Sequence, residues 1–307
     1  MLNSNLTRLL ILTSMWGPSF FFIKIAVEEI PPLTLVAIRL SLAAALLSLV
    51  LRLNGVRFPA GRKFWLKFAI MGFIATALPF SLFSIGEQFA DSTVASILNG
   101  TTPIFTVVIA HYWIKERFTP AKVLGVVVGF AGVVLVFFDD LIEFIGGARL
   151  GGNLEFFGLL AFVAAGFCYG LSITYGRRYL RGLPPLVGPA AQLICASAMI
   201  VPLALLFDRP FDLSPSLGAS LSLATLAIWG TALAYIVYYQ LVEHATATFL
   251  SLVTYLIPLI GILLGATLLD EPLTWNILIG FGLILIGVLI VNVSGKAPVP
   301  QPVQAEV

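Results

Sequence analysis

The chain has 307 residues, of which 59% are hydrophobic and 10% charged, and its formal net charge is +2. Soluble domains carry roughly 25% charged residues, so this composition excludes a soluble enzyme and a secreted disulfide scaffold, and the small net charge gives no reason to expect a nucleic-acid partner. The mean hydropathy of +1.03 predicts an all-α integral membrane protein with no soluble domain.

Ten apolar runs approach the length of about 20 residues that a helix needs to cross a bilayer. Proline-containing turns separate most of them. The longest connection, 139–153, is expected to be a loop, and residues 294–307, polar and rich in proline, are expected to form a disordered tail. The ten runs are 8–26, 33–53, 64–86, 93–113, 120–138, 154–176, 185–207, 217–240, 246–268 and 274–293.

The positive charges predict the orientation of these spans. With the N-terminus placed inside, 13 Lys and Arg residues fall near the inner ends of the spans, and only Lys24, Arg149 and Arg209 near the outer ends. Cytoplasmic loops carry such an excess of Lys and Arg. We therefore expect both termini to be cytoplasmic, as an even number of spans requires.

The two halves of the chain resemble each other at an offset of 155 residues, which defines two repeats, 1–140 and 154–293. Each repeat holds five predicted spans, so the second copy should enter the membrane from the opposite side. Inverted repeats of this kind are typical of secondary transporters, which bind substrate near the midplane between the halves. The matched pairs include Thr76 and Thr231, Pro103 and Pro258, Glu116 and Glu271, and Gly125 and Gly280.

Several motifs then point to a family. The opening segment carries Trp16-Gly17, Phe21, Lys24, Pro31-Pro32 and Arg39, and the repeats close with similar segments at 115–136 and 270–291. In these features the chain resembles the ten-span drug/metabolite transporters, which have two EamA-type repeats. The resemblance implies export of amino acids or other small metabolites through a central cavity, in a bacterial inner membrane. It does not identify the substrate.

Aromatic and polar side chains within the spans are the candidate substrate-binding residues. Phe80 and Phe83 share a helix face with Thr76, and their counterparts 155 residues later are tyrosines, whose hydroxyls suit a wet cavity. Interhelical packing or an interfacial aromatic belt is the alternative. The candidates are Trp16, Phe20, Lys24, Thr76, Phe80, Phe83, Asn99, Tyr169, Tyr235, Tyr238, Tyr239 and Tyr255.

A second set of residues is assigned to gating or structure. Lys24 either reaches the interface beside Glu28 or attracts a substrate carboxylate, and Arg39 is either a structural clamp or a gating group. Prolines within spans kink helices, and glycines allow close helix packing. This set is Arg39, Pro79, Pro103, Pro258, Gly125 and Gly280.

Several activities are not expected. The sequence has no phosphate-binding loop, so no ATPase function or subunit is implied, and no metal site, cofactor or enzymatic activity is predicted. No acidic residue lies at the centre of a span, which leaves the coupling ion open. We expect a transporter of small metabolites in a lipid bilayer, for which a monomer suffices; the alternatives are a carrier of phosphorylated sugars or nucleotide sugars, and a non-transporting membrane scaffold.

Overall fold

The computed structural model describes residues 2–145, 150–180, 182–244, 247–250 and 252–293. Arg149 and the predicted tail 294–307 therefore lie outside the described residues. The helices are α1 (Leu2–Trp16), α2 (Ser19–Val27), α3 (Pro32–Leu53), α4 (Arg62–Gly72), α5 (Leu78–Gly86), α6 (Ser92–Asn99), α7 (Thr102–Ile114), α8 (Pro120–Val136), α9 (Phe138–Ile145), α10 (Leu150–Tyr179), α11 (Val187–Phe207), α12 (Leu217–Ala227), α13 (Ala234–His244), α14 (Ala247–Leu250), α15 (Leu252–Leu268) and α16 (Trp275–Val293). Two π-helical turns, η1 (Phe73–Ala77) and η3 (Ile228–Leu233), and a 3-10 turn, η2 (Pro210–Asp212), complete the elements.

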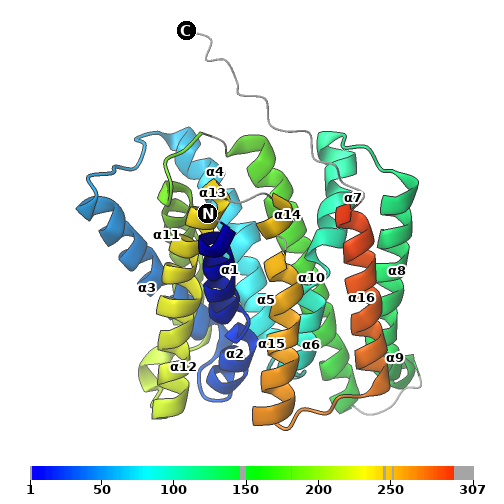
Figure 1. The fold of residues 1–307 in the computed structure, drawn as a ribbon. Helices are drawn as coiled ribbons and strands as arrows, with labels where there is room; N and C mark the ends of the chain where they lie inside the picture. The colour runs from blue at the N-terminus through cyan, green and yellow to red at the C-terminus, as the bar shows by residue number, and fades with distance from the viewer. Residues whose placement is uncertain (1, 146–149, 181, 245–246, 251, 294–307) are drawn as a thin grey trace.

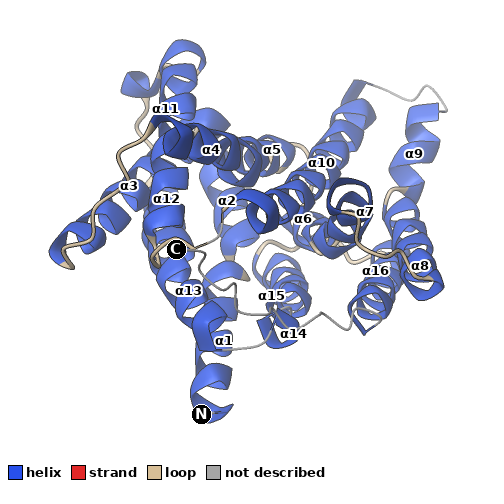
Figure 2. Cartoon of the chain, turned by 90° about the horizontal axis from the view of Figure 1, so that it is seen from above, coloured by secondary structure: helices blue, strands red, loops and turns tan. Residues whose placement is uncertain are grey.

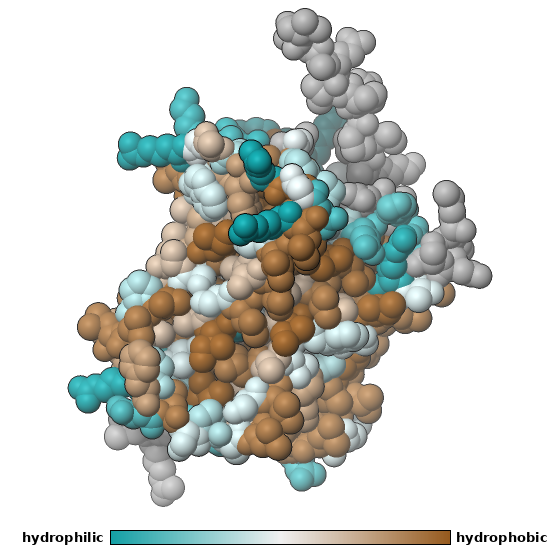
Figure 3. Space-filling view, turned by 90° about the vertical axis from the view of Figure 1, so that its left-hand side faces the viewer, coloured by the Kyte–Doolittle hydropathy of each residue, from teal (hydrophilic) through white to brown (hydrophobic). Residues whose placement is uncertain are grey.

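In the described residues, all ten predicted apolar runs coincide with helices. Eight of the described helical segments are long and apolar enough to cross a membrane, and two shorter apolar helices, 120–136 and 252–268, take the remaining places. A helix of 17 residues is about 25 Å long, slightly less than the roughly 30 Å of a hydrocarbon core. Figure 3 shows apolar side chains covering the middle of one face, with polar side chains concentrated towards its ends. The protein is a multi-pass membrane protein.

The bundle has two ends, called upper and lower after Figure 1. The upper end carries the connections α3–α4, α7–α8 and α10–α11, where the Lys and Arg residues gather; the lower end carries α2–α3, α5–α6 and α15–α16. Figure 2 places α3, α11 and α12 on one side, α8, α9 and α16 on the other, and α2, α5, α6 and α10 between them. The pairs α8–α16, α3–α11 and α5–α10 pack closely.

Two of the predicted spans are broken. The first stops at Trp16 and resumes at Ser19, and the fourth stops at Asn99 and resumes at Thr102. Pro18 has no N–H to continue the helix. A Cβ on Gly17 would lie 2.7 Å from Ile260 Cδ1, so the break also allows α15 to approach the backbone closely.

Two further spans contain a π-helical turn at corresponding positions. Leu78 donates its N–H to Phe73 O, five residues back, and Pro79 follows directly. In the second half Ala234 donates to Trp229 O, again five residues back. Pro79 has no N–H to donate to a carbonyl of the preceding turn, and a wider turn of this type accommodates the missing hydrogen bond. This reason applies only to the first half, because the counterpart of Pro79 is Ala234, which has an N–H.

The predicted loop over 139–153 was wrong. Residues 138–145 form α9, and α10 begins at Leu150 rather than at residue 154. Acidic and apolar residues alternate in α9 with a helical period, as in helices that lie at a membrane interface. Phe137, just before α9, packs edge to face on Phe156 of α10 at 6.0 Å.

Glycines bring α8 and α16 into contact. A Cβ on Gly125 would lie 2.7 Å from Gly287 O, and one on Gly280 would lie 2.8 Å from Gly132 O. We expect Gly125→Ala to lower the free energy of unfolding by about 1–3 kcal/mol, because the two backbones must separate. Denaturant titration in detergent micelles measures this. The matched control is Gly282→Ala on α16, where nothing lies within 4 Å; equal effects of both changes would contradict the packing argument.

Candidate functional site

An aromatic cluster lies where α2, α5 and α10 meet. The Phe83 ring packs edge to face on Phe20 at 5.1 Å and stacks on Phe162 at 5.7 Å and on Tyr169 at 6.1 Å. Phe20 and Phe83 are buried and Tyr169 is half-buried. Three of the predicted substrate-binding residues, Phe20, Phe83 and Tyr169, are thus brought together from both halves of the sequence.

A second aromatic group joins α1 to α13. The ring of Trp16 packs on Tyr238 at 5.4 Å, and Tyr238 packs on Tyr239 at the same distance. All three side chains are half-buried. These predicted residues therefore also contact one another, and they present ring faces and two phenol hydroxyls inside the bundle.

Arg39 links the halves between these two groups. Its side chain is 4% exposed, and Nε donates to Thr231 Oγ1 in η3 at 2.9 Å. The guanidinium lies 4.1 Å from the centre of the Phe80 ring, a cation–π contact. The phenols of Tyr169 and Tyr235 lie within electrostatic range. A permanently charged group is thus enclosed among aromatic side chains.

Lys24 reaches the lower end of α5. Its ammonium donates to the carbonyls of Glu87 and Ala90 at 2.9 Å each, groups that the end of a helix leaves without an internal partner. Two of its three donors are used in this way. The side chain is half-buried, so Lys24 and Arg39 are cations on neighbouring helices beside the aromatic cluster.

The other predicted residues are less closely grouped. Thr76 Oγ1 donates to Gly72 O within its own helix, while Gln192 donates to the Tyr235 hydroxyl at 3.2 Å. Tyr255 faces α16, where it accepts a hydrogen bond from Asn292 at 2.6 Å.

Asn99 is half-buried at the break between α6 and α7, and Pro103 is the second residue of α7. Pro258 lies inside α15 and would be 3.6 Å from a Cβ on Gly100. The α8–α16 contact that contains Gly125 and Gly280 lies to one side of the helices α2, α5 and α10 that carry the aromatic cluster (Figure 2).

Sequence reasoning missed the buried role of Glu271. Its carboxylate is 7% exposed and accepts hydrogen bonds from the backbone N–H groups of Ser92 and Thr93, both at 2.8 Å. It therefore caps the first turn of α6, where the helix dipole favours a negative charge. The cap comes from the segment before α16, in the other half of the chain. The repeat of this glutamate 155 residues after Glu116 was the available signal.

Two further carboxylates join the halves at the lower end. Asp208 Oδ2 accepts from the N–H and hydroxyl of Thr34, at 2.7 and 3.0 Å, in the first turn of α3. Glu29 accepts from the N–H and hydroxyl of Ser216 at 2.6 Å each, just before α12. The hydrogen bonds from Ser216 lower the pKa of Glu29. With Glu271, these contacts tie the lower ends of the two halves together.

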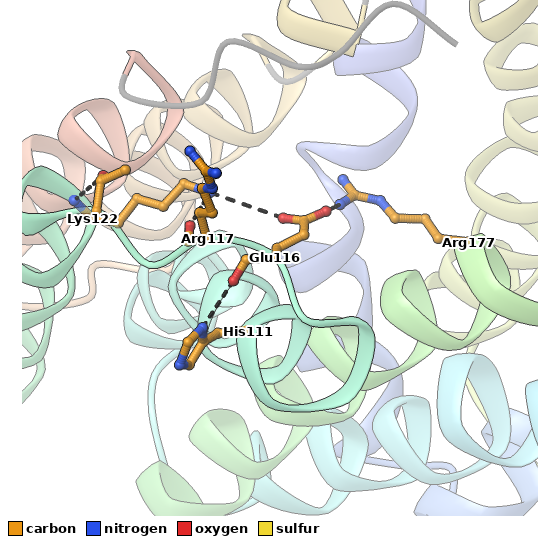
Figure 4. Close-up of polar contacts among 6 residues, drawn as sticks. His111, Glu116, Arg117, Lys122 and Arg177 are labelled. Carbon is orange, nitrogen blue, oxygen red and sulfur yellow. Dashed lines mark hydrogen bonds and ion pairs between the residues drawn. The ribbon is translucent and has the colours of Figure 1, made fainter. Parts of the chain in front are cut away.

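Glu116, the counterpart of Glu271, has different surroundings at the upper end (Figure 4). Its carboxylate lies 3.4 Å from Arg177 and 3.9 Å from Lys122, and it is 39% exposed. His111 Nδ1 is hydrogen-bonded to Glu116 O at 2.8 Å, so this ring nitrogen must carry the proton. The two related glutamates thus stand in unequal positions, one capping a buried helix and one in an exposed ion-pair group.

The fold and this interior are those of a membrane protein that moves ions or small molecules. Ionisable and aromatic side chains enclosed by membrane-crossing helices usually mark a pathway for ions or small molecules. Among the described residues no group of three His, Cys, Asp or Glu side chains could hold a metal ion.

The chain belongs to the EamA-like transporter family, whose sequence model matches residues 6–138 and 156–293. The drug/metabolite transporter resemblance is thereby confirmed, and membership implies a transport role.

Related proteins carry the same description. The chain is 28% identical over 276 residues to an uncharacterized transporter of Archaeoglobus fulgidus, covering 90% of this chain and 94% of the relative. It is 26% identical over 294 residues to the uncharacterized inner membrane transporter YedA of Escherichia coli K12, covering 95% and 92%. A solved crystal structure of a protein shares the fold, with a TM-score of 0.64 and 20% identity over 95% of this chain and 97% of that one.

Proposed function

We propose that this transporter exports small amphipathic metabolites, with amino acids as the substrate class and aromatic ones among them. The observation that carries the proposal is the placement of two cations, Lys24 and Arg39, beside an aromatic cluster inside the bundle. Aromatic faces suit an apolar or aromatic side chain, and the remaining ammonium donor of Lys24 suits a carboxylate.

The proposed cycle is alternating access between two inverted five-helix halves. The family model matches the chain twice, and the π turns η1 and η3 occupy corresponding places in the two matches. Each half contains five apolar segments, an odd number, which supports opposite orientations in the membrane. Both termini are proposed to be cytoplasmic, because the upper end collects the Lys and Arg residues, and an inner membrane location agrees with the description of YedA.

A carrier of phosphorylated sugars is the second candidate. Phosphate binding favours several enclosed cations, whereas in the described part of the chain only Arg39 is a buried cation and Lys24 is half-buried. The amino-acid proposal is therefore preferred.

Counterflow in proteoliposomes tests the proposal directly. Purified protein is reconstituted with unlabelled phenylalanine, threonine or leucine inside, and uptake of the labelled amino acid is followed. We expect exchange of at least one of the three above that of protein-free vesicles. If none of them exchanges, the amino-acid proposal is wrong, and a sugar phosphate tested in the same vesicles addresses the second candidate.

The aromatic groups predict a selectivity change. Tyr238→Leu keeps an apolar side chain on α13 but removes a ring face that packs on Trp16. Because aromatic pairs contribute about 0.5–1.5 kcal/mol beyond area burial, we expect phenylalanine counterflow to fall roughly 3–10-fold while leucine counterflow is unchanged. Tyr112→Leu, at a position 70% exposed, is the matched control. Equal losses for both amino acids would argue against ring recognition.

A further inference from the structure

Buried polar atoms without a hydrogen-bond partner gather in one place. Among the described residues, every such side-chain atom belongs to the short stretch 84–93, around the α5–α6 connection at the lower end. Buried polar groups in proteins are nearly always bonded, and exceptions call for an explanation such as a ligand. The atoms are Ser84 Oγ, Glu87 Oε1, Glu87 Oε2, Ser92 Oγ and Thr93 Oγ1.

The Glu87 side chain is the ionisable member of this group. It is 0% exposed, and neither carboxyl oxygen has a hydrogen-bond partner. An ionised carboxylate in such a place would lose its hydration without receiving donors in return. A protonated carboxyl is neutral, so a buried position without hydrogen-bond donors favours the protonated form.

Charged and titratable groups reach Glu87 from each packed element. Lys24 lies on α2 and Arg39 on α3, and Glu271 comes from the segment before α16. Tyr169 on α10 stacks on Phe83, one turn before Glu87. Asp91, in the same connection, is half-buried. Lys24 and Arg39 repel a metal cation at this carboxyl and also favour its ionised form. Complete burial without a hydrogen-bond donor opposes them and favours the protonated form.

We propose that Glu87 is the proton-binding residue of the transport cycle. This inference rests on the proposed transport function and supplies its coupling ion. When the proton is released to water on the side to which the transporter is open, the new carboxylate adjoins Lys24, whose ammonium now holds the carbonyls of Glu87 and Ala90. The ammonium then exchanges those carbonyls for the carboxylate, since the charged acceptor is the stronger one.

This exchange links the proton to substrate and to conformation. Lys24 serves as the carboxylate-binding group of the proposed substrate site, so pairing it with Glu87 removes the positive charge that the substrate meets. It also releases the end of α5 next to α6, whose first turn is held by Glu271 from the other half. Loss of one proton therefore acts on both the site and the contact between the halves.

Infrared difference spectroscopy tests the protonation without any substrate. The carbonyl-stretch band of a protonated carboxyl, identified by its shift in deuterated water, is recorded for purified protein from pH 5 to pH 10. We expect a band at pH 7 that is lost in Glu87→Gln and retained in Glu28→Gln, an exposed glutamate at the same end. Absence of the band in the wild type, or its survival in Glu87→Gln, would overturn the proposal.

Transport measurements test the coupling. An imposed pH gradient should drive phenylalanine accumulation at least several-fold in wild-type vesicles and in vesicles with Glu28→Gln, and it should have no effect with Glu87→Gln. Driving by a sodium gradient instead would overturn the proposal. If the infrared band is assigned to Glu87 but phenylalanine, threonine and leucine all fail to exchange, the amino-acid proposal is wrong and proton binding at Glu87 stands.

Discussion

Replacing Glu271 with alanine is expected to lower the free energy of unfolding by about 2–4 kcal/mol, because two buried backbone N–H groups then lose a charged acceptor. Ser92 and Thr93 donate these hydrogen bonds, both at 2.8 Å. The cap also connects the two halves, so the lower end should open more readily. Denaturant titration in micelles measures the first effect, and accessibility of a cysteine placed at position 92 to a water-soluble maleimide measures the second.

Glu116→Ala is the matched control for this prediction. It removes the related glutamate of the other half, whose side chain is 39% exposed and whose closer ion-pair partner, Arg177, is 48% exposed. Exposed pairs contribute about 0–1 kcal/mol, so the change in stability should be small. A larger loss for Glu116→Ala than for Glu271→Ala would contradict the assignment of the cap.

Arg39→Met is expected to abolish phenylalanine counterflow while leaving stability unchanged or improved. Methionine fills much of the same volume, and replacing a buried ion by an apolar side chain is often neutral or stabilising. The substitution removes the hydrogen bond to Thr231 and the charge over Phe80. Thr231 keeps its own hydrogen bond to Leu226 O at 2.8 Å, so no buried hydroxyl is left without a partner.

Arg39→Ala separates packing from charge at the same position. It removes charge and volume together and should cost about 2–5 kcal/mol, as other buried truncations to alanine do. Counterflow and unfolding are measured on both variants. If Arg39→Met unfolds as easily as Arg39→Ala yet still transports, Arg39 is a structural clamp rather than a residue of the transport site.

The membrane-crossing segments were the part of the fold that hydropathy could predict. In lipid, backbone groups must bond within the segment, so each apolar run was expected to form a helix. The breaks at Gly17-Pro18 and Gly100-Thr101 depend instead on close contacts between helices, such as that of Gly17 with Ile260. Hydropathy did not predict helix α9, which at 8 residues is too short to cross a membrane.

The candidate site was predictable only where its residues share one face of a single helix. Phe80 and Phe83 follow each other along α5, and their spacing alone puts them on one side. Tyr255, predicted as a substrate-binding residue on another span, accepts a hydrogen bond from Asn292 of α16, a contact between helices that spacing within one helix does not predict. The burial of Glu87 and Glu271 was not predicted, since it depends on segments far away in the sequence that cover them.

The two π turns bear on the history of the chain. A π turn holds one residue more than an α turn of the same rise, so an extra residue gained by one half alone would shift the register between the halves. Yet Ala69 and Ala224 lie before the two turns, Thr76 and Thr231 inside them, and Pro103 and Pro258 beyond them, all at the same separation of 155 residues. One insertion in an ancestral five-helix protein, before its gene was duplicated and fused, would account for both turns.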